Sequence, residues 1–298
     1  MGEKINHVEF ELTYLCNLRC LHCFNETHSK TPQLDTEQVK NILDQIKALG
    51  INEVHFNGGE PLTRSDIYEL LEYSTKIGLI TKLETNAILL SRLDFLVGLQ
   101  NFSIRASIDG PENIHNIIRE SNKKGINVFK ETMENLRKAK NLGIQIQLTT
   151  SINKLNYKYI YELTEQTNNY GMTDIRLRLT LPVGFALDNW DRLGDLNEED
   201  TLEIEKIAKR IREDFPHVYF DTSTLARTKP GVQNILTINP EGKVKYYKFT
   251  TLFVGDLKTE SLEAIVNHLI DIKMKNESTE KISRFIDQAK LEKSNIID

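Results

Sequence analysis

Cysteine, proline and glycine are all scarce in this 298-residue chain, with three, seven and 15 copies respectively. So little glycine and proline excludes collagen-like and low-complexity sequences. Apolar runs such as 88–90 and 95–97 are far shorter than the roughly 20 residues that cross a bilayer, and the first residues lack an apolar signal core. The 38 basic residues do not outnumber the 43 acidic ones, so the basic excess of a nucleic-acid-binding surface is also absent. We therefore expect a globular, cytoplasmic enzyme that binds neither nucleic acid nor a membrane.

All three cysteines lie within eight residues, in the pattern C-x3-C-x2-C: Cys16, Cys20 and Cys23. An odd, clustered set is not a disulfide framework and indicates metal or redox chemistry. The run 8–13 before the motif alternates apolar and polar residues, so we expect the motif in a loop at the end of a strand. Three thiolates can hold an iron–sulfur cluster and leave one iron open to another ligand. Two alternatives remain, a structural zinc site completed by His22 or His28, and three unrelated free thiols.

Strand-like and helix-like segments alternate along the chain to about residue 215. The strands are predicted near 7–13, 52–57, 80–85, 101–108, 144–151 and 174–180. The helices are predicted near 35–49, 65–77, 90–98, 127–142, 157–170 and 198–214. Six such βα units predict an α/β fold with a parallel sheet and right-handed crossovers.

The predicted strands are not apolar throughout, although parallel strands covered on both faces usually are. In 102–109, for example, Phe102 and Ile104 alternate with Ser103 and Arg105. A closed eight-stranded barrel fills its interior with branched apolar side chains. The alternation therefore predicts an open barrel whose polar lumen holds a polar cofactor and substrate. An antiparallel sheet with one wet face would also alternate, but the intervening helices argue against it.

The cysteine motif, with His22 before its last cysteine, and the βα pattern after it resemble the radical S-adenosylmethionine (radical SAM) family. The resemblance implies a partial (β/α)6 barrel with its site at the carboxyl ends of the strands. It implies one [4Fe-4S] cluster on the three cysteines, whose fourth iron binds S-adenosylmethionine. It also implies that a 5′-deoxyadenosyl radical abstracts a hydrogen atom from a substrate, and that a flavodoxin- or ferredoxin-type protein supplies the electron.

Three later segments resemble motifs of the same family, Asn57-Gly-Gly-Glu-Pro61, Thr85-Asn-Ala87 and Ser107-Ile-Asp-Gly110 with the following His115 and Arg119. In that family the first motif binds the methionine amino group, the serine contacts the ribose and the arginine binds the methionine carboxylate. Asp109 is open to a second interpretation, as the cap of the turn that follows it. The loops after the fifth and sixth strands supply further contacts. The resemblance thus assigns these residues to S-adenosylmethionine: Gly58, Gly59, Glu60, Asn86, Ser107, Arg119, Ser151 and Gly184.

The sequence from residue 216 onwards is not expected to continue the barrel. Short strands are predicted at 218–221, 234–239 and 243–249, and a helix at 260–269, with a charged helical tail at 271–298. This part resembles the small α+β SPASM or twitch extension of peptide-modifying radical SAM enzymes, so we expect domains at 1–215 and 216–298. Tyr247 occupies the position of a cluster-binding cysteine. Because no cysteine follows Cys23, we expect no auxiliary cluster, and no net oxidation that would need one.

Several polar side chains are predicted to line the lumen and contact the substrate: His55, Arg105, Arg176 and Arg178. They can hold an anionic or amide-rich substrate, or they can pair with Glu9, Glu11 and Glu84 and be structural. The SPASM-like extension favours a ribosomally made peptide as the substrate. No leader-binding domain is expected before the barrel, so a partner protein could bind the leader. The alternatives are a small-molecule substrate (a sugar, nucleoside or amino acid) and a non-catalytic metal-binding scaffold.

Overall fold

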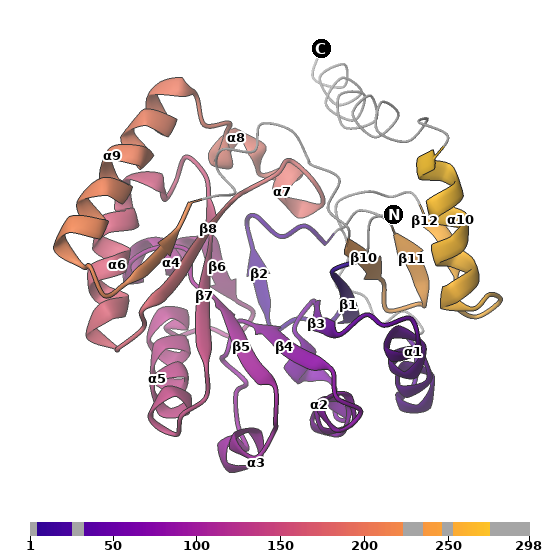
Figure 1. Cartoon of the computed structure of the whole chain (residues 1–298). Coiled ribbons are helices and arrows are strands. Elements are labelled where there is room, and N and C mark those ends of the chain that lie inside the picture. Colours follow the sequence, from indigo (N-terminus) through magenta and orange to yellow (C-terminus); the bar gives the residue numbers. More distant parts are fainter. Residues whose placement is uncertain (1–4, 26–32, 223–234, 246–252, 275–298) are drawn as a thin grey trace.

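The computed structural model describes residues 5–25, 33–222, 235–245 and 253–274, with side chains up to residue 269 (Figure 1). Its centre is a continuous ten-stranded sheet in the order β12-β11-β10-β1-β3-β4-β5-β7-β8-β9. The strands from β1 to β9 in this order run parallel. Their bounds are β1 His7–Thr13, β3 Glu53–Gly58, β4 Ile80–Thr85, β5 Phe102–Ser107, β7 Ile146–Ile152, β8 Asp174–Leu179 and β9 Tyr219–Asp221.

Helices cover the outer face of this curved sheet (Figure 1). They are α1 Thr36–Ala48, α2 Ile67–Lys76, α3 Leu93–Val97, α4 Glu112–Ile118, α5 Val128–Asn141, α6 Ile160–Asn169 and α9 Glu198–Asp214. Two single turns of 3-10 helix, Pro61–Thr63 and Tyr157–Tyr159, and two short helices, α7 Phe185–Asp188 and α8 Trp190–Leu193, lie in the connections. The predicted α/β fold with an open (β/α) barrel is confirmed.

Local sequence signals explain where the longer helices begin and what they bury. In α1 the Gln38 backbone N–H donates to the Asp35 side chain, and the Asp35 backbone N–H donates to the Gln38 side-chain oxygen, which forms a capping box. Val39 and Leu43, with Ile42 and Ile46, form its buried face. Within the described ranges, no helix combines the length and the apolar character needed to cross a bilayer.

The two faces of the barrel strands differ as the alternation predicts. Val8, Phe10 and Phe56 belong to the apolar core that packs under the helices, and all three are fully buried. On the opposite face the strand register places polar residues side by side, which we call the lumen band. Its members pair as Glu9 with His55, Glu11 with Asn57, Glu84 with Arg105, Arg105 with Gln147, and Thr149 with Arg176.

The sheet continues past residue 215, so the expectation that the later residues do not continue the barrel is wrong for β9 and β10. β9 pairs parallel to β8, and β10 (Ile235–Ile238) pairs parallel to β1. β11 (Lys243–Lys245) and β12 (Phe253–Asp256) continue the sheet antiparallel, and α10 (Leu262–Met274) lies beside them (Figure 1). The domain boundary at 215 stays a prediction. Tyr247 and the tail from 275 lie outside the described residues.

Candidate functional site

The cysteines occupy the loop that follows β1, and a small second sheet shapes this loop. β2 (Leu18–Cys20) pairs antiparallel with β6 (Arg119–Ser121), which places Cys20 opposite Arg119. The three cysteine side chains pack against the apolar residues Leu18, Ile88, Ile126 and Val128. All three thiols are free. Sequence reasoning missed this sheet because a three-residue strand shows no periodicity.

The surroundings of the thiols favour protonation unless a cation binds them. Burial raises the pKa of the Cys16 thiol to about 12. Burial also raises the pKa values of Cys20 and Cys23, although the Arg119 guanidinium partly opposes this. A metal centre that binds the thiolates would supply the missing positive charge.

The three thiols are not gathered as closely as the ligands of a single zinc ion. Zinc binds thiolates at about 2.3 Å, which brings neighbouring sulfurs to about 3.8 Å of one another in a tetrahedral site. Among the described residues, a set of three possible ligand atoms within 4.8 Å occurs at His7, Glu9 and His55 and not at the cysteines. The ring of His22, a proposed fourth zinc ligand, instead bonds Asp109. His28 lies outside the described residues.

The glycine pair after β3 lets two backbone segments touch. A Cβ on Gly59 would lie 2.2 Å from Leu15 O, and one on Gly58, whose φ is +120°, would lie 2.5 Å from Thr13 O. The Gly59 N–H donates to Thr13 O and the Glu60 N–H to Leu15 O, both at 2.7 Å. The pair therefore attaches the β3 end to the loop that carries the cysteines, whatever ligand it also binds.

The Glu60 carboxylate holds the end of β4 in place. It is fully buried and accepts hydrogen bonds from Leu62 N, Thr85 Oγ1 and Asn86 N, at 2.8 to 3.1 Å. Burial raises its pKa in spite of these donors. Asn86 in turn points Nδ2 at Asn17 (2.8 Å) and at Cys16 Sγ (4.0 Å). The structure thus brings two residues assigned to S-adenosylmethionine to the cysteine loop.

Asp109 links the cysteine loop to the carboxyl ends of β5 and β7. Its buried carboxylate accepts hydrogen bonds from Arg119 Nε (2.5 Å), His22 Nε2 (2.6 Å) and Ser151 N (2.8 Å). Burial alone would raise its pKa, but Arg119 and His22 outweigh that effect and hold the pKa well below its usual range. Arg119 Nη1 also lies 3.7 Å from Cys20 Sγ. Asp109 is therefore an anchor and not the cap of α4, whose N-cap is the next residue but one.

The segment after β8 closes over the chain that follows Cys23. A Cβ on Gly184, whose φ is +57°, would lie 2.0 Å from Phe24 O. The Ala186 N–H donates to Cys23 O at 2.9 Å. Ser107, at the carboxyl end of β5, is half-buried. The residues assigned to S-adenosylmethionine thus come from six loops or strand ends, and most contact the cysteine loop or Asp109.

The four side chains expected to contact substrate are not equivalent. His55 Nε2 bonds Glu53 Oε1 at 2.5 Å, and Arg105 Nη1 bonds Glu84 Oε1 at 2.5 Å. Burial would lower the pKa of His55, but its bonds to Glu53, Glu84 and Glu9 raise it to about 9. In contrast with these, Arg178 is exposed.

Arg176 lies near two carboxylates, with Nε 3.8 Å from Asp174 and Nη1 3.9 Å from Asp221. The structural alternative left open for the lumen cations was pairing with Glu9, Glu11 and Glu84. His55 lies beside Glu9 and Glu84, and Arg105 beside Glu84, whereas Arg176 has other acidic neighbours. Contact of these side chains with substrate stays a prediction.

Glu53 and Asp174, which lie beside His55 and Arg176, were missed. Each lies two residues before its partner on the same strand, Glu53 before His55 and Asp174 before Arg176, and therefore on the same face. This spacing was the available signal.

Comparison with known proteins identifies the family. The model of the "Radical SAM superfamily" matches residues 10–166, more than half of the chain. The chain belongs to the radical SAM superfamily. The family uses a [4Fe-4S] cluster and S-adenosylmethionine, and the buried thiols, their spacing and the surrounding anchors fit both groups.

The relatives of this radical SAM protein are named for different activities. It is 30% identical over 187 residues to "AdoMet-dependent heme synthase" from Oleidesulfovibrio alaskensis, covering 60% of this chain and 46% of that one. It is 29% identical over 194 residues to "Mycofactocin maturase MftC" from Mycolicibacterium smegmatis, covering 64% and 48%. This chain thus spans about half the length of these two curated relatives.

A solved structure shares the fold over most of the chain. Streptococcus suis SuiB bound to precursor peptide SuiA superposes with a TM-score of 0.74, at 13% identity, covering 89% of this chain and 65% of that one. At this identity the likeness concerns the fold alone. It includes the region beyond residue 166, where the family model ends.

Proposed function

We propose that this radical SAM enzyme abstracts a hydrogen atom from a ribosomally synthesised peptide and so modifies it. When bound, the cluster and S-adenosylmethionine supply the electron and the carbon radical for that step. The protein's own residues position these groups and exclude water. Asp109 fixes the Arg119 guanidinium beside Cys20, so that Arg119 can direct its remaining N–H groups to a carboxylate. Glu60 and the glycine pair fix the facing loop.

The observation that carries the peptide proposal is a set of unsatisfied polar atoms in the lumen band and on β10. Asn57 Oδ1, Thr149 Oγ1 and Thr237 Oγ1 are buried and have no hydrogen-bond partner among the described residues. Thr237 pairs with Glu9 in the parallel register, so it faces the lumen too. A buried unpaired polar atom costs about 1–3 kcal/mol. A peptide backbone offers both the N–H donors and the carbonyl acceptors that these atoms lack.

The charges of the lumen favour a neutral, amide-rich substrate over a strongly anionic one. Three of the cations that could bind an anion are already paired, and Arg178 is exposed. The pairs are Lys82 with Glu53, Arg105 with Glu84, and Arg176 with Asp174 and Asp221. A polyanion would have to break these pairs. The likeness to a heme synthase supports the alternative, a small-molecule substrate, and the likenesses to a mycofactocin maturase and to SuiB with its precursor peptide support the peptide.

The proposal carries three further expectations about the cell. We place the enzyme in the cytoplasm, with a flavodoxin- or ferredoxin-type reductant. We also expect a separate leader-binding protein to assist substrate binding. Because Cys23 is the last cysteine, no protein thiol is left to return a hydrogen atom, and no thiolates remain for an auxiliary cluster that would accept the substrate electron. We therefore expect a redox-neutral outcome, return of the electron to the first cluster, or quenching by a tyrosine or an external thiol.

The test is formation of 5′-deoxyadenosine by the anaerobically reconstituted full chain with dithionite and S-adenosylmethionine. Peptides encoded by short open reading frames beside the gene should increase turnover and gain or lose mass. Uroporphyrinoid and nucleotide substrates, at the same concentration, should not. Stimulation by one of these small molecules and by no peptide would overturn the peptide proposal. No cofactor cleavage with about four irons bound per chain would overturn the catalytic role itself.

A further inference from the structure

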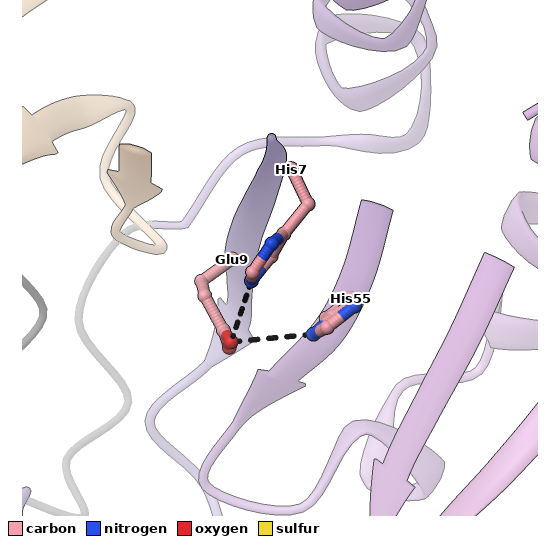
Figure 2. Close-up of side chains that lie close together, drawn as sticks. All are labelled: His7, Glu9 and His55. Atoms are coloured by element: carbon pink, nitrogen blue, oxygen red, sulfur yellow. Dashed lines mark hydrogen bonds and ion pairs between the residues drawn. The ribbon is translucent and has the colours of Figure 1, made fainter. Parts of the chain in front are cut away.

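A second group of possible metal ligands lies at the opposite end of the barrel lumen from the cysteines. Figure 2 shows His7 and Glu9 on β1 and His55 on the neighbouring β3, all three directed toward one point. β1 begins at His7, whereas Cys16 follows its other end. Glu9 and His55 are buried, and His7 is half-buried, so the point is reached from the base of the barrel past His7.

The distances suit three ligands of one ion better than two hydrogen bonds. His7 Nε2 lies 3.4 Å and His55 Nδ1 lies 3.2 Å from the same atom, Glu9 Oε1. Charge-assisted N–H···O bonds are usually about 2.7–2.9 Å. Zinc holds nitrogen and oxygen ligands at about 2.0–2.1 Å, which in a tetrahedral site separates neighbouring ligand atoms by about 3.4 Å. All three ligand atoms lie within 4.8 Å of one another. The His7 and His55 rings are stacked, with centroids 4.2 Å apart, so the half-buried His7 ring must turn before both nitrogens can face one ion.

A supporting carboxylate orients His55 for this role. Its Nε2 lies 2.5 Å from Glu53 Oε1, which also accepts from Lys82. Nε2 thereby keeps its proton, and Nδ1 is the nitrogen that faces Glu9. An ion bound at Nδ1 would replace the proton that Nδ1 shares with Glu9. Carboxylate–histidine–metal arrangements of this kind are the usual second shell of a metal site.

The competing cation at this place is Arg105. Its Nη1 lies 3.3 Å from His55 Nδ1 and could donate to that nitrogen when it is deprotonated. The same Nη1 lies much closer, at 2.5 Å, to Glu84 Oε1, which is its main partner. Glu9, Glu53 and Glu84 together surround His55 with three carboxylates, and this excess of negative charge favours a cation.

We propose that His7, Glu9 and His55 bind one divalent transition-metal ion, with zinc as the best fit, and leave a fourth position open to water or a substrate carboxylate. Two histidines and one glutamate form a known ligand set for zinc with an open position. The site shares no residue with the cysteine loop or with the groups assigned to S-adenosylmethionine. Metal binding there can therefore be tested without the cluster or S-adenosylmethionine, although Glu9 and His55 also belong to the lumen band.

Zinc alone is the probe, and the cysteines must be kept from binding it. The full chain with C16A, C20A and C23A removes every thiol. Equilibrium dialysis of this chain should give one zinc per chain, and X-ray absorption should give nitrogen and oxygen neighbours at about 2.0–2.1 Å without sulfur at 2.3 Å. His7→Asn and Glu9→Gln should each weaken zinc binding at least tenfold. His217→Asn is the matched control, because His217 bonds Asn168 outside the site and should leave zinc affinity unchanged.

Two results would overturn the proposal. One is a folded thiol-free chain, checked by circular dichroism, that binds no zinc at 100 μM. The other is zinc with nitrogen and oxygen neighbours that persists unchanged in both H7N and E9Q. If the thiol-free chain does not fold, the cluster-loaded wild-type chain replaces it, since iron then occupies the thiols; zinc seen there with sulfur neighbours alone would also refute the site.

Discussion

Gly59→Ala tests whether the glycine pair serves the protein's own backbone and not a ligand alone. A Cβ at residue 59 would lie 2.2 Å from Leu15 O and 2.7 Å from both Leu15 C and Tyr14 O. These are backbone atoms, so no side-chain rotation relieves the overlap. The loop that leads into Cys16 must move away from the end of β3.

The cost follows from the contacts that cross this junction. Ordinary contact of a Cβ begins near 3.4 Å, so the two segments must separate by about 1 Å. The bonds from Gly59 N to Thr13 O and from Glu60 N to Leu15 O, both 2.7 Å, would then exceed hydrogen-bonding distance. Two lost bonds with buried partners cost about 2–4 kcal/mol. For a chain of 298 residues that lowers the melting temperature by about 3–6 °C.

The assay is thermal unfolding of the cluster-free protein, followed by iron analysis after reconstitution. G59A should unfold at lower temperature and bind fewer than four irons per chain, because the displaced loop carries the cysteine ligands. Gly98→Ala is the matched control. Its φ is −72°, and the nearest atom to an added Cβ is Phe95 O at 3.4 Å, so its melting temperature should stay near the wild-type value.

The reasoning is refuted by one particular combination of results. Suppose that cluster-free G59A has the melting temperature of the wild type and binds a full cluster, but no longer binds S-adenosylmethionine. The glycine is then needed for the ligand alone. A loss of stability in G98A equal to that in G59A would show that any alanine at a loop glycine has this effect.

Two further predictions concern buried carboxylates. Asp109→Asn leaves the Arg119 guanidinium without its counter-charge, so it should lower the free energy of unfolding by about 3 kcal/mol; an unchanged midpoint in urea would contradict the anchoring role. Asp200 has its pKa lowered from 3.8 to about 2 by hydrogen bonds from Lys154 and Tyr157. Its contribution of about 1–2 kcal/mol is therefore present above pH 4 and lost as the pH falls toward 2. In Asp200→Asn the melting temperature should change less between pH 4 and pH 2 than in the wild type. A melting temperature that falls as steeply with pH as in the wild type would contradict this.

The barrel strands could be located from the sequence because each alternates between an apolar and a polar face. The predicted strand at 80–85 coincides with β4, and the helix at 198–214 coincides with α9. The pairing of β10 with β1 could not be predicted, because a local sequence pattern does not indicate which strand more than 200 residues away will pair with it. The β2–β6 sheet was missed because segments of three residues are too short to show a period.

The site was predicted unevenly for a similar reason. The cysteines and the Gly-Gly-Glu stretch carry short motifs, whereas the anchoring by Asp109 depends on where two loops meet. His7 was not singled out because one histidine at the start of a strand has no pattern of its own. Ala87 is instructive, since its φ of +60° lies in the left-handed region. The backbone at this position thus favours glycine, although alanine occupies it.

The insertion of β10 beside β1 affects the order in which the chain can fold during its synthesis. The ribosome releases β1 early, but the strand that covers its outer edge emerges only after about 220 further residues. Until then β1 presents an open edge that invites pairing with other chains. Completion of the sheet is therefore expected to wait until β10 has emerged, with a slow step set by this distant pairing. A chaperone that binds exposed strands would protect the nascent enzyme during that interval.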